Sequence, residues 1–242
     1  MRDGTTKKLY ESMMRLIIVG DIPQGEILTD LGLAAQFNTS RTPVREACIY
    51  LVKEGFLRRA LGRGYIVTDI SLDDVRELYQ LRLMMEPLAA ELAARTSLPK
   101  DFFHTCSKLI EQQRVAHVTD ERSYEKFMEG GKAEYGFHCE IAKASGNKRL
   151  AKIMAELMNQ YRRFHYITFQ KSPALNSAMD EHLEILEAIR RRDASQSHQL
   201  MYEHIQKGSQ RAFQLALGSL SGQEPKLTRE LASRRSTDFA PS

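Results

Sequence analysis

The chain has 242 residues, which is enough for two ordinary domains with real hydrophobic cores, and its formal net charge is +4. It has no apolar run of about 18 residues and no secretion-signal pattern at its start, so we expect a cytoplasmic protein without a membrane partner. Its three cysteines are an odd number without metal-type spacing, which argues against a disulfide framework or a cysteine-based zinc finger.

The first 70 residues have the pattern of a compact helical unit. Apolar periodicity predicts helices over about 6–19 and 30–37. The polar residues 38–40 then favour a turn, because their side chains compete with helical hydrogen bonding. We expect the third helix to open with Thr42 as N-cap and Pro43 at the first helical position, where a missing N–H costs nothing.

The third predicted helix has two different faces. Apolar residues recur along one of them at helical spacing, namely Val44, Ala47, Cys48, Leu51 and Val52. We expect that face to pack inward and the helix to end at Gly55. The opposite face carries Arg45, Ile49 and Lys53 and points to solvent.

Two short strand patterns follow, at 56–59 and 65–68, around a glycine-rich segment that suits a tight turn. Between residues 41 and 63 the chain carries six basic side chains against two acidic ones. Such an excess is typical of a surface that binds phosphates, although a charge run is more often only a solvated face. The fold class predicted for residues 1–70 is a winged helix-turn-helix, with three helices and a β-hairpin wing.

Residues 71–218 are predicted to be all helical, a bundle that binds an effector and dimerises. A capping-box pattern at 71–74 opens a long helix that ends near Arg95. The further predicted helices cover about 99–118, 123–144, 148–170, 174–192 and 194–217. Residues 219–242 are polar and rich in serine and arginine, so we expect a disordered tail.

The two regions resemble one family of bacterial regulators. The first resemblance rests on Ser40–Ala47, Leu51, Glu54–Leu57 and Gly64–Val67, which are similar to the GntR family. The second rests on Leu81–Arg82, Glu86–Ala90, Phe137–His138 and Ala144–Asn147, which resemble the FCD ligand-binding domain of the FadR subfamily. Together they cover nearly all of residues 8–217 and imply a homodimeric, ligand-responsive transcription regulator, more often a repressor, on a short palindromic operator.

The resemblance places the third helix in the major groove and the wing tip near the minor groove. The DNA-binding residues it implies are Ser40, Arg41, Thr42, Arg45, Arg63 and Gly64. We expect Arg45 to read a base, because a guanidinium binds guanine O6 and N7 bidentately, and Ser40 to bind a phosphate. Arg63 and Gly64 either touch the DNA or form an exposed hairpin tip. Leu31 stands where some members have a further arginine.

Glu134 and His138 are four residues apart and share one face of a predicted helix. The apolar spacing around His182 and His204 turns both imidazoles inward. Many FCD domains bind a divalent metal through one Asp and three His at matching positions, so the resemblance implies a site in which Glu134 replaces the Asp. Imidazole and carboxylate ligands suit Zn²⁺, Ni²⁺ or Mn²⁺, with zinc mildly favoured.

The same resemblance implies a small organic or sugar acid as the effector, bound near the metal. Arg82 is the best candidate to pair with its carboxylate, because a planar guanidinium suits bidentate contact. An internal salt bridge is an equally good interpretation of Arg82. Arg162 is the weaker candidate, and the four remaining histidines are expected to be ordinary structural or surface residues.

Two other functions compete with this interpretation. One is a metal-free regulator that senses an acyl-CoA or an apolar ligand in the bundle. The other is a metal-dependent hydrolase or lyase, which would need a general base or nucleophile beside the metal. No accompanying catalytic motif is found, and the winged unit would have no use in an enzyme, so we expect no enzymatic activity.

Overall fold

The computed structural model describes residues 4–62, 64–69, 71–118, 124–169 and 176–220. Arg63 and the tail from residue 221 onward, for which predictions were made, lie outside the described residues. The chain divides into two compact units, Met1–Ser71 and Leu72–Ser242, and each is described by itself. The fold is mainly helical with a small β-hairpin wing, as the sequence predicted.

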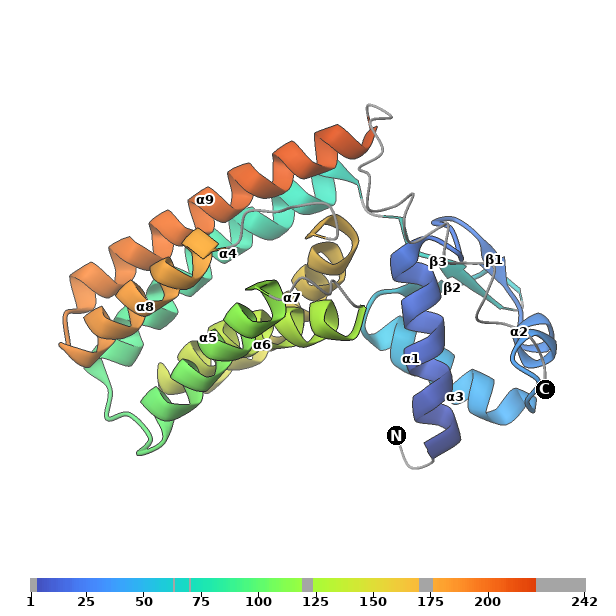
Figure 1. Cartoon of the computed structure of the whole chain (residues 1–242), viewed down its shortest axis with the longest axis horizontal. Coiled ribbons are helices and arrows are strands. Elements are labelled where there is room, and N and C mark those ends of the chain that lie inside the picture. Colours follow the sequence, from blue (N-terminus) through green and yellow to red (C-terminus); the bar gives the residue numbers. More distant parts are fainter. Residues whose placement is uncertain (1–3, 63, 70, 119–123, 170–175, 221–242) are drawn as a thin grey trace. The chain divides into compact units, whose positions relative to one another are not determined.

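The first unit is a winged helix-turn-helix. Its helices are α1 (Gly4–Val19), α2 (Asp30–Gln36) and α3 (Arg41–Lys53). Its strands are β1 (Ile27–Leu28), β2 (Leu57–Arg59) and β3 (Tyr65–Val67), which form an antiparallel sheet in the order β1-β3-β2 (Figure 1). The β-hairpin and the three helices were predicted, whereas β1 was not.

The core of this unit lies between α1 and α3. The inward face of α3 is confirmed: Val44, Ala47, Cys48 and Leu51 are completely buried, and only Val52 is half-buried. Burying one such aliphatic side chain stabilises the fold by about 1.5–3 kcal/mol. Helix α1 donates hydrogen bonds from Thr6 Oγ1 to Glu46 of α3 at 3.0 Å and from Tyr10 OH to Glu54, the C-cap residue of α3, at 2.5 Å.

Helix α3 begins two residues earlier than its sequence predicted. Ser40, not Thr42, is the N-cap residue, and its side chain makes no capping hydrogen bond. Pro43 therefore occupies the third helical position rather than the first. It is tolerated there because the N–H groups of the first turn have no intrahelical acceptor, so proline removes no hydrogen bond.

The second unit is an all-helical bundle, as predicted. Its helices are α4 (Leu72–Arg95), α5 (Phe102–Val118), α6 (Tyr124–Ala144), α7 (Lys148–Phe169), α8 (Asn176–Arg190) and α9 (Ala194–Leu220). Figure 1 shows α9 running alongside α4 with α8 next to them, and α5 packs on α6, which packs on α7. Helix α9 continues two residues beyond residue 218, where the bundle was expected to end.

Small residues let the long helices approach closely. Ala89, Ala90, Ala93 and Ala94 of α4 are at most 1% exposed. The C-terminal end of α4 is closed by Arg192, which has φ 60° and donates through Nη1 to the carbonyl oxygens of Ala94 and Thr96. A side chain from the α8–α9 turn thus satisfies carbonyl groups that helix α4 leaves without internal donors.

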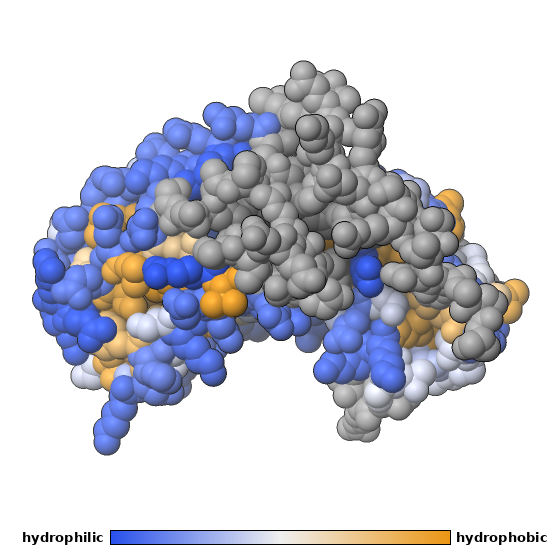
Figure 2. Space-filling model, in the orientation of Figure 1, coloured by the Kyte–Doolittle hydropathy of each residue, from blue (hydrophilic) through white to orange (hydrophobic). Residues whose placement is uncertain are grey.

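Hydrophilic residues dominate the coloured surface in Figure 2, with apolar residues in smaller patches between them. Within the described part of the chain, no helix combines the length and the apolar character that crossing a lipid bilayer requires. The three cysteines are buried and unpaired, as expected of small reduced hydrophobic residues.

Candidate nucleic-acid interface and metal centre

The outer face of α3 carries the side chains predicted to meet DNA. Ser40, Arg41, Thr42 and Arg45 are all exposed at the N-terminal end of this helix. The two guanidinium groups share one partner, Asp30 of α2. Its Oδ2 atom lies 2.5 Å from Nε of Arg45 and 3.6 Å from Nη2 of Arg41, and a hydrogen bond with Asp30 raises the pKa of Arg45.

The structure of the wing explains why position 64 is a glycine without any reference to DNA. Its φ is +120°, and a Cβ atom there would lie 2.3 Å from the carbonyl oxygen of Leu28 in β1. Only glycine allows β1 and β3 to approach this closely. Arg58 and Arg59 of β2 are exposed, so the hairpin presents basic side chains beside Arg63 in the sequence.

In the second unit, the four predicted metal ligands meet at one point. Glu134 and His138 come from α6, His182 from α8 and His204 from α9, and one donor atom of each lies within 4.8 Å of all the others. His138 Nε2 is 3.4 Å from Glu134 Oε1, and His182 Nε2 is 3.8 Å from Glu134 Oε2 and 3.1 Å from His204 Nε2. All three imidazoles are buried.

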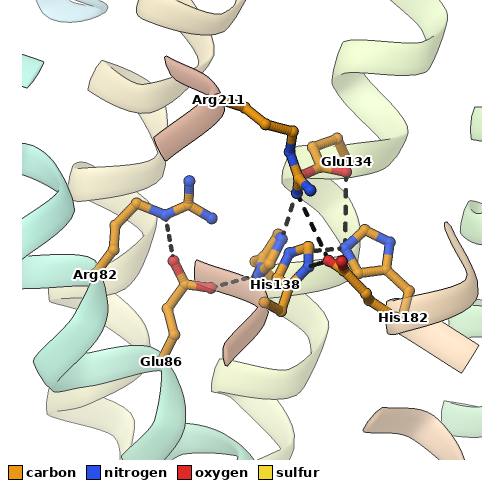
Figure 3. A network of polar contacts seen from close by, with 8 residues as sticks. Arg82, Glu86, Glu134, His138, His182 and Arg211 are labelled. Atoms are coloured by element: carbon orange, nitrogen blue, oxygen red, sulfur yellow. Dashed lines mark hydrogen bonds and ion pairs between the residues drawn. The ribbon is translucent and has the colours of Figure 1, made fainter. Parts of the chain in front are cut away.

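Two further carboxylates contact the Nδ1 atoms of two of these imidazoles. Glu86 of α4 pairs with Nδ1 of His138, and Figure 3 shows it lying between Arg82 and His138. Glu181 of α8 is 2.7 Å from Nδ1 of His204. A carboxylate on Nδ1 favours the tautomer whose Nε2 lone pair faces the centre, which is the arrangement that protein metal sites use.

The donor set fits a divalent metal. Ligand atoms about 2.1 Å from a tetrahedral ion lie about 3.4 Å from one another. The three separations above bracket that value. Three imidazole nitrogens and one carboxylate oxygen are ligands that borderline metals prefer, and an ion that takes five or six ligands would keep positions for water or for oxygens of a bound acid.

The buried groups perturb one another strongly. Burial by itself lowers the pKa of an imidazole, but the carboxylates of Glu86 and Glu134 outweigh it and raise the pKa of His138 to about 9. Burial lowers the pKa of His204 and brings that of His182 well below its ordinary value. Burial favours neutral Glu134, yet His182 and His138 hold its pKa well below the usual range.

Arg82 forms the internal salt bridge that was one of its two interpretations, and the effector contact stays a prediction. Its Nε lies 2.5 Å from Glu86 Oε1, and both side chains are only 2% exposed, so the internal salt bridge exists. The guanidinium also lies 3.8 Å from the ring centre of Tyr161, and its Nη2 has no hydrogen-bond partner in the described part of the chain. The side chain of Arg162, the weaker candidate, lies outside the described residues.

A small pocket, partly open to solvent, reaches the predicted metal ligands. Its lining residues are Tyr79, Arg82, Glu134, Tyr161, His165, Ala178, His204, Ile205, Gly208 and Arg211. Arg82 and two predicted metal ligands, Glu134 and His204, therefore line one cavity. The lining includes a second guanidinium, that of Arg211, a residue for which the sequence offered no signal beyond its charge.

Two features of the site were not predicted from sequence. The supporting carboxylates Glu86 and Glu181 were not among the candidates, although a carboxylate one turn after Arg82 or directly before His182 is a detectable signal. His165, which was expected to be an ordinary residue, is buried and lines the pocket.

Family models match both units. The model described as "Bacterial regulatory proteins, gntR family" covers residues 5–67, and the FCD domain model covers residues 77–207, more than half of the chain. The two matched families and the relatives named below identify a transcription regulator rather than an enzyme. The chain belongs to the GntR family and carries an FCD domain, as its motifs indicated.

Individual relatives are similar over most of their length. The Nta operon transcriptional regulator of Aminobacter aminovorans is 26% identical over 197 residues, 81% of this chain and 89% of that protein. The gluconate operon transcriptional repressor of Bacillus subtilis (strain 168) is 27% identical, over 81% of this chain and 79% of that protein. The structure of E. coli McbR/YncC shares the fold, with a TM-score of 0.66 at 20% identity over 88% of this chain and 98% of that one.

Proposed function

We propose that the protein is a homodimeric repressor that binds a short palindromic operator and is released by a small organic or sugar acid bound beside a divalent metal. The observation that carries the proposal is the cavity that Arg82 shares with the metal ligands Glu134 and His204. One relative is named as the repressor of a gluconate operon, which is consistent with an organic-acid signal.

On the DNA side, Arg45 reads a base and Ser40 binds a phosphate. Arg45 is more than half exposed and projects from the first turn and a half of α3, while Ser40 lies at its N-cap, where backbone N–H groups favour anions. Arg41 and Thr42 extend the same surface, and Arg63 and Gly64 are assigned to the wing contact. An operator with two-fold symmetry calls for a two-fold dimer.

On the effector side, Glu134, His138, His182 and His204 would hold the ion, with zinc mildly favoured over nickel or manganese. When bound, the ion supplies open coordination positions for oxygens of the acid. The chain's own contribution is Arg82, whose buried Nη2 has no acceptor among the described residues and is free to donate to a carboxylate. Arg211 adds positive charge to the same cavity.

Helix α4 links this site to the DNA-binding unit. Arg82 and Glu86 lie on α4, and Glu86 holds the ligand His138. Only four residues separate the end of β3 from the start of α4. An acid that binds Arg82 therefore contacts the helix that follows the wing in the chain. It weakens operator binding if it binds more tightly to the state of the bundle that has the lower affinity for DNA.

The charged groups of the lining favour this function over the metal-free alternative. An apolar ligand offers no partner for charged groups, whereas this cavity contains two arginines and the half-buried carboxylate of Glu134. A metal-free regulator would also leave three buried imidazoles converging on Glu134 without a ligand to bind.

The test is the thermal unfolding of the metal-loaded protein against a panel of organic and sugar acids, repeated after chelation. A ligand at 100 times its Kd stabilises the native state by about 2.7 kcal/mol. We expect one acid class to raise the unfolding midpoint, an effect that is lost after chelation and in Arg82→Met. If acyl-CoA or an apolar ligand stabilises the chelated protein while no acid shifts the loaded one, the carboxylate proposal is wrong.

The DNA assignment has its own test in two alanine variants. Arg45→Ala should lose about 1–3 kcal/mol of operator binding and relax the preference at one base pair. Ser40→Ala should weaken binding to all sequences alike, because a phosphate contact carries no sequence information. If both variants weaken operator and random DNA equally, Arg45 does not read a base.

A further inference from the structure

Asp30 of α2 is placed where it can control how the recognition arginines meet DNA. Its carboxylate is the one group that the two arginines of the α3 entrance share, at 2.5 Å from Arg45 and 3.6 Å from Arg41. The Asp30 side chain is only 16% exposed, whereas the arginines are 55% and 53% exposed. A nearly buried carboxylate thus holds two guanidinium groups whose outer parts face solvent.

The carboxylate is itself held in place by the fold. Thr29 caps α2 by accepting a hydrogen bond from the backbone N–H of Gly32 at 3.0 Å, which fixes the helical turn that starts at Asp30. Leu33 and Ala34 anchor the same helix in the core of the unit. Asp30 therefore approaches α3 from a rigid element rather than from a loop.

The contact occupies the inner edge of Arg45 and leaves its outer edge available. Asp30 accepts from Nε, so both terminal nitrogens of Arg45, Nη1 and Nη2, can still donate to guanine O6 and N7. A guanidinium that is already oriented loses less side-chain freedom when it meets the base. The geometry thus favours base recognition.

The same carboxylate opposes contacts that carry no sequence information. Non-specific binding comes from basic side chains that neutralise phosphates. One carboxylate between two arginines cancels one of their two positive charges and keeps both groups from swinging freely toward the nearest phosphate. Asp30 is thereby placed to lower the affinity for random DNA more than the affinity for the operator.

We propose that Asp30 is a positioning residue for operator specificity, which orients Arg45 toward a base and restrains Arg41 and Arg45 from binding phosphates at random. The proposal rests on the proposed function, because it requires Arg45 to read a base. It adds a carboxylate on α2 to a DNA-binding surface that was otherwise assigned to α3 and the wing.

The experiment uses the full-length protein and two duplexes. One is the duplex that the wild-type protein enriches from a random library, and the other is a scrambled duplex of the same composition. Affinities are measured over a salt series for the wild type, Asp30→Asn, Asp30→Glu and Glu11→Gln. Glu11→Gln is the matched control, since it removes one exposed negative charge from α1 of the same unit.

For Asp30→Asn we expect about 10-fold less discrimination between the two duplexes, mainly through tighter binding of the scrambled one. Its salt dependence on scrambled DNA should steepen by about one phosphate contact. Asp30→Glu should restore most of the discrimination, because it keeps the charge. Discrimination that is unchanged, or changed equally in Glu11→Gln, overturns the proposal, since only net charge would then be acting.

A double-mutant cycle separates this proposal from the one on which it rests. If Asp30 acts through Arg45, then Asp30→Asn costs much less discrimination in the Arg45→Ala background than in the wild type. Equal costs in both backgrounds overturn the positioning role. If Arg45→Ala alone keeps full discrimination, the base-reading assignment of Arg45 fails first, and the role of Asp30 fails with it.

Discussion

Replacing Arg82 by methionine tests whether the salt bridge in the bundle supports the fold as well as the site. Met fills nearly the same space but leaves Glu86 with His138 as its sole described ion partner. Because Glu86 is 2% exposed, its carboxylate cannot recover solvent contacts, and breaking one side of such a buried pair costs about 3–5 kcal/mol. The lost cation–π contact with Tyr161 acts in the same direction.

We expect a loss near the lower limit, about 3 kcal/mol, because His138 still pairs with Glu86. In a unit of this size that lowers the unfolding midpoint by about 6–12 °C. The assay is urea and thermal unfolding of the metal-free protein, and the matched control is Arg95→Met. Arg95 lies on the same helix but is 64% exposed in its pair with Glu91, and such surface pairs contribute less than about 1 kcal/mol.

Adding Glu86→Gln to Arg82→Met should recover part of the loss, since it removes the unpaired charge. The reasoning is refuted if Arg82→Met destabilises the protein no more than Arg95→Met does. Glu86 would then tolerate its burial without the arginine. The low pKa of Glu86, about 2, which persists despite burial because of Arg82 and His138, would also need another explanation.

Three further predictions concern other parts of the chain. Gly64→Ala should destabilise the protein more than Gly62→Ala in urea unfolding. Both substitutions cost about 1–3 kcal/mol of backbone strain, but only at position 64 would the new Cβ clash with a backbone carbonyl oxygen. Equal losses of stability would contradict this reasoning. Glu181→Gln should weaken metal binding about 10–100-fold, measured by competition with a coloured chelator, because it changes the group that contacts His204 Nδ1. The control Glu187→Gln, on the exposed side of the same helix, should leave the metal affinity unchanged. An unchanged affinity in Glu181→Gln would show that Glu181 does not support the site. Burial raises the pKa of Cys48 to about 12, so about one thiol in 10⁴ is ionised at pH 8. Alkylation of Cys48 should therefore be slow in the native protein, faster as the pH rises, and fast in urea. Rapid labelling of the native state would show that the thiol is accessible.

Local spacing predicted the elements whose partners lie close along the chain. Glu134 and His138 share a helix face because they are four residues apart, and the structure places both in the candidate metal-ligand cluster. The inward face of α3 follows from the same helical period. The sequence also predicted that His182 and His204 face the core, because apolar neighbours at helical spacing surround both, and both are buried in the structure.

Partners that lie far apart in the chain could not be predicted in this way. Glu86 and His138 are 52 residues apart, and nothing in either local pattern says which carboxylate meets which imidazole. Glu181 directly precedes His182 in sequence yet supports His204, 23 residues away. These pairings depend on how helices pack, which sequence periodicity does not specify.

Two local features also differed from expectation for physical reasons. Strand β1 has only two residues, Ile27 and Leu28, too few for a detectable alternation, and it exists because β3 offers it a pairing edge. The start of α3 was placed at Thr42 because proline prefers the first helical position, although the whole first turn tolerates it.

The contacts of Glu86 have an evolutionary consequence. This carboxylate neutralises Arg82 on one side and supports His138 on the other, so changing it alone leaves two buried groups without their partner. On the proposed function, lineages that no longer bind the ion should therefore lose all three residues together, whereas lineages that bind it should inherit them as a set. Positions 82, 86 and 138 are expected to covary among relatives, although 52 residues separate the last two.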